Sequence, residues 1–412
     1  MVNKWKEVRG LEFDQVVWLL DQRFDFLLPW FEKEYNISCK DILFVGSYHG
    51  NTRKGLRKVT VGNLLDGHVS YLEPEDINKL YAGEITTDKK TLLVPFSGAY
   101  LPSAENVISF IATGNIAIDI NNKWWQYKFF CRIGVKTPKT WRAENHSQLL
   151  NLIRTLFGRY ESLIIKKAEL AGGFKMKMVS SVEDVIEYYK MLEEDLLNSE
   201  FLVSEYIPHE QSFSGMGIID RGGNVIWCGA TEQVLYNGLA YEGLIWPPYI
   251  GDEGLRDIKN ITLKVGKRMS EQGYFGYFNV DFIQGTDEMY VVEINARFCF
   301  STLFYACCCG KKFWKAVQGK EIIERRLDGR LILGKIKAQE GKSYSELTDK
   351  SNILEWFNSG ISGFQTYFVG ADEPEYYDYG SFIGLFGEFL PKNTNRNDAL
   401  RLFWDRCLQQ YR

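Results

Sequence analysis

The chain has 412 residues, of which 45% are hydrophobic and 25% are charged, and its formal net charge at pH 7 is −4. This length fits two or three folding units of roughly 100–150 residues, and the composition is that of an ordinary globular protein. The small acidic charge excludes a basic surface for nucleic acid, and no apolar run approaches the length that spans a bilayer. The first residues are charged and lack the apolar core of a signal peptide, so we expect a cytoplasmic protein.

The eight cysteines and four histidines show no pattern of a metal or nucleophile site. No two cysteines form a Cys-x-x-Cys pair, and the three consecutive cysteines at 307–309 cannot converge on one metal without unusual backbone. We therefore expect reduced, mostly buried thiols. The histidines lie in separate segments, so catalysis is not expected to depend on histidine.

Residues 1–120 are predicted to form a small α/β domain. The spacing of apolar residues predicts an amphipathic helix over 12–28. Strands are expected at 41–47 and 91–96, and a helix near 104–112 is expected to end at Gly114 as its C-cap. The loop at 47–55 has the wrong glycine spacing for a dinucleotide-binding fingerprint, so we interpret it as a surface loop.

The next part of the chain predicts a helix from about Asn122 to Arg132, which ends before Gly134. A helix at 147–160 and strands at 163–166 and 174–179 follow. The two strands flank Gly172-Gly173, which predicts a β-hairpin that needs no function of its own. A glycine loop of this kind can bring backbone N–H groups close to phosphate oxygens, because no Cβ stands in the way.

Further along, Ser181 and Asp184 have the spacing of a variant capping box at the start of a helix over 182–197. A strand begins at Phe201, and a β-hairpin is expected over 213–230. Residues 231–249 read as a long aromatic loop, which is either packed cover or the wall of a substrate site; we favour the wall. A helix over 257–271 completes this region.

Residues 273–297 predict a β-hairpin whose side chains suggest a metal site. If Gln284 pairs with Tyr290, antiparallel counting places Asp281 opposite Glu293. It also places Asn279 opposite Asn295. Opposed carboxylates repel unless a cation lies between them, and Mg²⁺ prefers such oxygen ligands. The pattern alone does not separate this site from a solvated charged face.

An aspartate on one strand, a turn, and then Glu293-x-Asn295-x-Arg297 resembles the C-terminal signature of the ATP-grasp superfamily, which contains ATP-dependent ligases of carboxylates. The resemblance implies that Asp281, Glu293 and Asn295 hold two Mg²⁺ ions, or Mn²⁺ in their place, against the phosphates of ATP. It implies that Arg297 faces the transferred phosphoryl group or the substrate carboxylate.

The same resemblance extends to the lysines and glycines upstream. Lys123 matches the lysine that reaches the nucleotide phosphates, although Asn122 stands where the family usually has aspartate. Lys166 matches the second nucleotide lysine, here followed by Lys167 where the family often has proline. The hairpin with Gly172-Gly173 matches the one that folds over the triphosphate.

Residues 201–210 resemble the hinge strand of the family, which binds the adenine edge. Glu205, Tyr206 and Ile207 match the adenine-binding part. Glu210 is the nearest candidate for the acid that binds the ribose, although Gln211 lies closer to the spacing in the family.

The resemblance covers about residues 120–300 and implies an ATP-grasp fold of mixed α and β structure. The implied units are an N-terminal α/β domain (1–120), a small lobe with the glycine-rich hairpin (121–205), a large lobe with the metal site (206–310) and a C-terminal extension (311–412). The extension mixes a basic helix with strand-like aromatic segments at 364–369 and 376–390. It is either a lobe over the active site or a homodimer surface.

The implied activity joins a small-molecule carboxylate to an amine, such as amino acids or a short peptide, through an acyl phosphate, and releases ADP and phosphate. Arg297 and Lys166 are the implied catalytic residues. D-alanine ligases have an arginine where Asn279 stands, so more of the transition-state charge would rest here on Arg297 and the lysines. Two alternatives remain open: a kinase on the same fold, and a nucleotide-binding regulatory protein without turnover.

Overall fold

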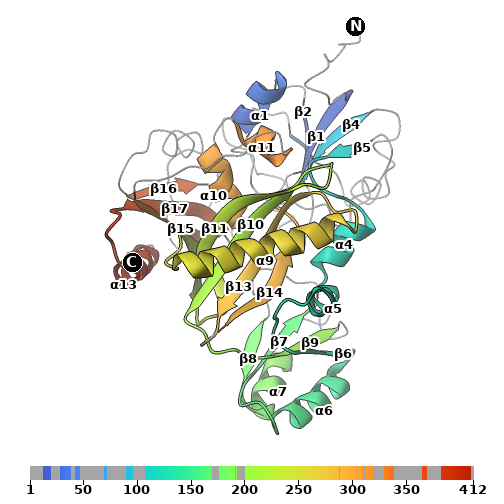
Figure 1. Cartoon of the computed structure of the whole chain (residues 1–412), viewed down its shortest axis with the longest axis vertical. Helices are drawn as coiled ribbons and strands as arrows, with labels where there is room; N and C mark the ends of the chain where they lie inside the picture. Colours follow the sequence, from blue (N-terminus) through green and yellow to red (C-terminus); the bar gives the residue numbers. More distant parts are fainter. Residues whose placement is uncertain are drawn as a thin grey trace.

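The computed structural model describes residues 13–19, 28–38, 42–46, 69–71, 90–95, 107–168, 176–190, 192, 200–286, 288–309, 312–318, 329–337, 364–368 and 382–409. These residues form sheets of five, four and eight strands. The five-stranded and four-stranded sheets lie at opposite ends of the molecule, with the eight-stranded sheet between them (Figure 1). None of the described helices is long and apolar enough to cross a membrane.

The N-terminal sheet is entirely parallel, with the strand order β3-β2-β1-β4-β5. Its elements are β1 (Gln15–Leu19), α1 (Leu28–Tyr35), β2 (Ile42–Gly46), β3 (Val69–Tyr71), β4 (Thr91–Val94) and β5 (Val107–Ser109). The strands predicted at 41–47 and 91–96 are confirmed as β2 and β4. The loop at 47–55 lies outside the described residues.

Two helices predicted in this region are wrong. Strand β1 lies where a helix was predicted over 12–28. It is the central strand of a parallel sheet and is covered on both faces. Val16, Val17 and Trp18 are at most 1% exposed, and such a continuous apolar run mimics helical spacing. Strand β5 replaces the helix near 104–112. Gly114, expected as its C-cap, instead precedes α4 (Asn115–Asn121) with a φ of 73°.

The four-stranded sheet is antiparallel, with the order β6-β9-β7-β8, and α6 and α7 pack against one of its faces (Figure 1). The elements of this region are α5 (Lys123–Ile133), β6 (Thr140–Ala143), α6 (His146–Leu156), β7 (Leu163–Lys167), β8 (Lys177–Val179), α7 (Val182–Lys190) and β9 (Phe201–Glu205). All of them except β6 were predicted from the sequence. The predicted capping box opens α7, because Ser181 Oγ accepts from the Asp184 N–H at 3.1 Å and Asp184 Oδ2 accepts from the Ser181 N–H at 3.0 Å. This sheet and its two helices share one apolar core.

The eight-stranded sheet is antiparallel and has the order β14-β13-β10-β11-β12-β15-β17-β16. Its strands are β10 (Gln211–Ile219), β11 (Val225–Tyr236), β12 (Ala240–Trp246), β13 (Gly276–Gln284), β14 (Met289–Asn295), β15 (Arg330–Lys337), β16 (Phe364–Phe368) and β17 (Phe382–Leu390). The aromatic loop predicted at 231–249 is wrong, because most of it pairs as β11 and β12. The strand-like tail is confirmed, and its strands extend this same sheet through the pairing of β12 with β15.

Helix α9 (Asp252–Ser270) crosses one face of the large sheet (Figure 1). Two glycines allow this close approach. A Cβ on Gly215 would lie 2.2 Å from Thr262 Oγ1, and a Cβ on Gly266 would lie 2.6 Å from the Phe278 ring. Larger residues at these positions would push the helix off the sheet.

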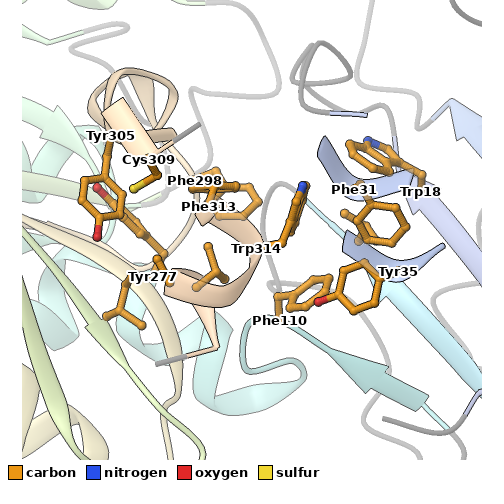
Figure 2. Close-up of a cluster of buried hydrophobic side chains, with 14 of the residues drawn as sticks. Trp18, Phe31, Tyr35, Phe110, Tyr277, Phe298, Tyr305, Cys309, Phe313 and Trp314 are labelled. Carbon is orange, nitrogen blue, oxygen red and sulfur yellow. The ribbon is translucent and has the colours of Figure 1, made fainter. Parts of the chain in front are cut away.

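An aromatic cluster joins the N-terminal sheet to the large sheet. It includes side chains from α10 (Phe300–Cys309) and α11 (Phe313–Val317), and Figure 2 shows Trp314 between the two groups of rings. The Trp314 ring lies 5.7 Å from Trp18 and 5.0 Å from Phe31, measured between centroids. On the other side, the cluster continues to Phe298 and Tyr277. Because these large rings are buried together, the cluster holds the two sheets in one arrangement.

Candidate functional site

The hairpin of β13 and β14 pairs the carboxylates as the sequence predicts. Asp281 lies opposite Glu293, and Asn279 lies opposite Asn295. The assumed pairing of Gln284 with Tyr290, from which these pairs were counted, was wrong, because Tyr290 lies opposite Ile283. A β-bulge shifts the register by one residue between Asp281 and Phe282. The bulge restores the predicted pairs at the end of the hairpin that carries the polar residues.

Asp281 is the centre of a polar network on one face of the sheet. Its carboxylate accepts hydrogen bonds from Ser214 Oγ and from Asn295 Nδ2, both at 2.8 Å. Burial and the nearby Glu293 carboxylate raise the Asp281 pKa to about 7, although the hydrogen bond from Ser214 and the charge of Arg297 oppose the rise. A cation bound here would therefore stabilise the charged form of Asp281.

Glu293 faces two lysines from other elements. Lys123 Nζ lies 3.0 Å from Glu293 Oε1, and the two side chains are 9% and 21% exposed. Burial alone would raise the Glu293 pKa, but the positive charges of Lys123, Arg297 and Lys166 together lower it. Burial and the charge of Lys123 lower the pKa of Lys166 to about 8, and Glu293 acts in the opposite direction. Glu293 thus lies in a positive environment that suits an anionic ligand.

Local structure explains the position of Lys123. Asn122 caps α5 by accepting from the Trp124 and Trp125 N–H groups at 3.0 Å, so Lys123 is the first helical residue. The Lys123 N–H donates to Ala168 O at 3.0 Å, which ties the start of α5 to the chain just after β7. Because Lys166 lies near the end of β7, this contact brings the two lysines to one place. Helix α5 ends before Gly134, as predicted, and Gly134 itself has the left-handed conformation.

Arg297 completes the group. Its Nη2 donates to Asn295 Oδ1, and its Nη1 donates to Phe298 O at 3.3 Å. The structure therefore brings together six of the residues that the sequence analysis selected: Lys123, Lys166, Asp281, Glu293, Asn295 and Arg297. They come from α5, β7 and the hairpin of β13 and β14.

The sequence analysis missed two serines next to this group. Ser214 of β10 pairs with Asp281 across the sheet, and Asn279 Nδ2 donates to Ser214 Oγ at 2.8 Å. Asn279 Nδ2 also donates to Ser301 Oγ on α10. No local signal identifies either serine, because both reach the network through pairing and packing between distant segments. The buried Asn279 Oδ1 has no hydrogen-bond partner among the residues that the structure describes.

The hinge residues form a second group where the chain leaves β9. Glu205 Oε1 accepts from the Lys139 N–H at 2.8 Å, and the Tyr206 N–H donates to Ser162 O at 3.3 Å. Ile207 lies against the turn between β13 and β14, since a Cβ on Gly285 would be 3.2 Å from Ile207 Cγ2. Glu210 is exposed. Gly172 and Gly173 lie outside the described residues.

The oxygen atoms at the hairpin suit a hard divalent cation. Two carboxylates and the Asn295 amide are available. Within the described residues, no three His, Cys, Asp or Glu side chains form a dedicated metal cage. This donor set matches Mg²⁺, which is usually held by one or two carboxylates together with nucleotide phosphates.

Comparisons with known proteins agree on one fold. Residues 120–301 match the family model of the ATP-grasp domain. A solved ADP complex of N5-carboxyaminoimidazole ribonucleotide synthetase has a TM-score of 0.65 at 13% identity, covering 96% of this chain and 97% of that chain. A β,γ-ATP complex of biotin carboxylase from Campylobacter jejuni has a TM-score of 0.65 at 16% identity, covering 97% of this chain and 91% of that chain.

A third similar structure contains metal. The biotin carboxylase domain of the 2-oxoglutarate carboxylase from Hydrogenobacter thermophilus, solved with MgADP and bicarbonate, has a TM-score of 0.63 at 14% identity and coverage of 92% and 86%. At these identities the likeness establishes the fold, which confirms the fold class predicted from the sequence.

Proposed function

We propose that this chain, whose residues 120–301 match the ATP-grasp domain, is an ATP-dependent ligase that joins a carboxylate to an amine. The observation that carries the proposal is the contact of Lys123 with Glu293 at 3.0 Å, beside the opposed Asp281. Lysines and paired carboxylates at one point are what a metal-bound polyphosphate requires.

In this proposal two Mg²⁺ ions would be held by Asp281, Glu293 and Asn295. Mn²⁺ would replace Mg²⁺ at the same ligands. When bound, the metal neutralises charge on the phosphates during transfer. Lys123 and Lys166 bind the phosphates, because both already face an anionic group, Glu293. Glu205, Tyr206 and Ile207 line the adenine side, and Glu210 binds the ribose.

The reaction consists of two displacements. A carboxylate oxygen of the substrate attacks the γ-phosphorus of ATP, and the bond to the β-phosphate oxygen breaks to release ADP. The amine then attacks the acyl carbon, the bond to the phosphate oxygen breaks, and the amine loses a proton as phosphate leaves. Arg297 and Lys166 offset the negative charge that develops in both steps. No protein base is assigned, because the attacking carboxylate is already ionised at neutral pH.

We propose that the substrates are amino acids or a short peptide. The related carboxylase structure contains bicarbonate, which makes bicarbonate the second candidate for the carboxylate. We also propose cytoplasmic location, supported by Cys131, Cys228 and Cys299, which are not in disulfides. A homodimer is proposed by analogy with the dimeric carboxylase domain.

Phosphate release tests the reaction. Purified protein with MgATP is screened against pairs of carboxylates, including bicarbonate, and amines. A ligase releases ADP and phosphate only when both substrates are present. A kinase would release ADP and keep the phosphoryl group on its product, and a regulatory protein would release neither.

The intermediate is tested separately. Without an amine, hydroxylamine should trap the activated carboxylate as a hydroxamate. When the carboxylate carries ¹⁸O, one labelled oxygen should appear in the released phosphate. Formation of the conjugate with unlabelled phosphate would refute the acyl phosphate.

A further inference from the structure

The C-terminal helix α13 (Arg396–Gln409) is linked to the segment that carries the proposed adenosine contacts. Arg396, its first residue, donates from Nη2 to the carbonyl oxygen of Glu210 at 2.8 Å. The two residues are 186 positions apart in the sequence. Glu210 immediately precedes β10, so Arg396 fixes the end of the segment that runs from β9 to β10.

The other side of the Arg396 guanidinium is held by a buried carboxylate. Arg396 Nε donates to Glu232 Oε1 at 2.6 Å, and the Glu232 side chain is 0% exposed. The second oxygen of Glu232 accepts from the Tyr249 N–H at 3.0 Å. The carbonyl of Tyr249 accepts from Gln211 Nε2 at 2.8 Å, so this network also reaches the residue after Glu210.

Helix α13 does not need this ion pair for its attachment. Ala399, Phe403 and Cys407 are buried in a core with side chains from β11, β12, β15 and β17. A buried ion pair is often no more stabilising than an apolar pair of the same size, because both charges lose their hydration. The directional bonds of Arg396 therefore define a position more than they add stability.

We propose that Arg396 is a positioning residue for the nucleotide: through Glu210 it sets where the segment from β9 to β10 meets the adenosine end of ATP. The proposal rests on the proposed function, which assigns this segment to adenine and ribose. It predicts that loss of Arg396 weakens all adenine nucleotides equally, because the phosphate contacts come from Lys123 and Lys166 on other elements.

The test measures dissociation constants for AMP and ATP by calorimetry, with thermal unfolding in parallel. Arg396→Met should weaken both nucleotides by about tenfold, as expected when a charge-assisted hydrogen bond is lost. Arg396→Lys should retain part of the affinity, because an ammonium can make one of the two bonds. Arg401→Met is the control, since Arg401 lies on the same helix, is exposed, and pairs with Asp398.

A double variant separates positioning from stability. Arg396→Met alone leaves the Glu232 charge buried, whereas Arg396→Met with Glu232→Gln removes both charges and should recover the unfolding temperature. Nucleotide affinity should stay low in this variant. Recovery of wild-type affinity together with stability, or a loss confined to ATP, would overturn the proposal. Wild-type protein that binds neither nucleotide would refute the proposed function as well.

Discussion

Replacing Lys123 by methionine should change the binding of metal and of nucleotide in opposite directions. Lys123 forms an ion pair with Glu293, one of the proposed metal ligands. A divalent cation that binds without nucleotide must displace this ammonium group. When ATP is present, the ammonium is instead free to move to the phosphates. Lys123→Met therefore removes a competitor of the metal and a ligand of ATP at the same time.

The size of the effect follows from the contact. The two atoms lie 3.0 Å apart and the side chains are mostly buried, so the interaction is that of a charge-assisted hydrogen bond. Such a bond contributes about 1.5–3 kcal/mol, or about a tenfold to hundredfold change in a dissociation constant. We expect Lys123→Met to tighten Mn²⁺ binding without nucleotide by at least about tenfold. We expect it to weaken ATP binding by a similar factor.

Electron paramagnetic resonance of free Mn²⁺ measures the metal, and calorimetry measures ATP. Lys136→Met is the control, because Lys136 pairs with Glu288 at the opposite end of the same hairpin and should change neither affinity. If Lys123→Met leaves Mn²⁺ binding unchanged or weakens it, Lys123 does not compete with the metal for Glu293.

Three further predictions concern neighbouring residues. Glu293→Gln and Asn295→Ala should each abolish turnover while leaving the unfolding temperature near that of wild type; full activity of both at ordinary Mg²⁺ would exclude them as metal ligands. Lys166→Ala should weaken ATP by about tenfold to hundredfold but AMP much less, measured by calorimetry; equal losses would contradict a phosphate role. Lys167 is 3% exposed, and burial lowers its pKa from 10.5 to about 8. At a pH between these two pKa values, Lys167 therefore carries a proton in the unfolded chain but not in the folded protein. The free energy of unfolding should therefore rise with pH in that window relative to Lys167→Met, by roughly 1–2 kcal/mol between pH 8 and 9.5 in denaturant titrations. Parallel pH profiles of the two proteins would show that this lysine does not titrate differently on folding.

Much of the ATP-grasp region could be predicted because its signals are local. Asn122 and Gly134 mark the two ends of α5 by side-chain capping and by a left-handed backbone, which depend only on neighbouring residues. The hairpin of β13 and β14 was predicted from two runs of strand-forming residues on either side of a polar turn. The pairing of Asp281 with Glu293 was also correct, although counting did not reveal the bulge that produces it.

Local signals failed where burial decides the structure. Val16 to Trp18 are apolar at every position, so the sequence does not distinguish a buried parallel strand from a helix; only the neighbouring strands β2 and β4 decide. Ser214 enters the candidate site through strand pairing, and Arg396 reaches Glu210 and Glu232 from the far end of the chain. Short-range sterics determine helix caps, turns and the alternation of side chains along a strand, so the sequence by itself specified these features. The register, the cross-sheet hydrogen bonds and the burial that shifts the Asp281 pKa arise only when distant segments pack together, so the tertiary structure alone decided them.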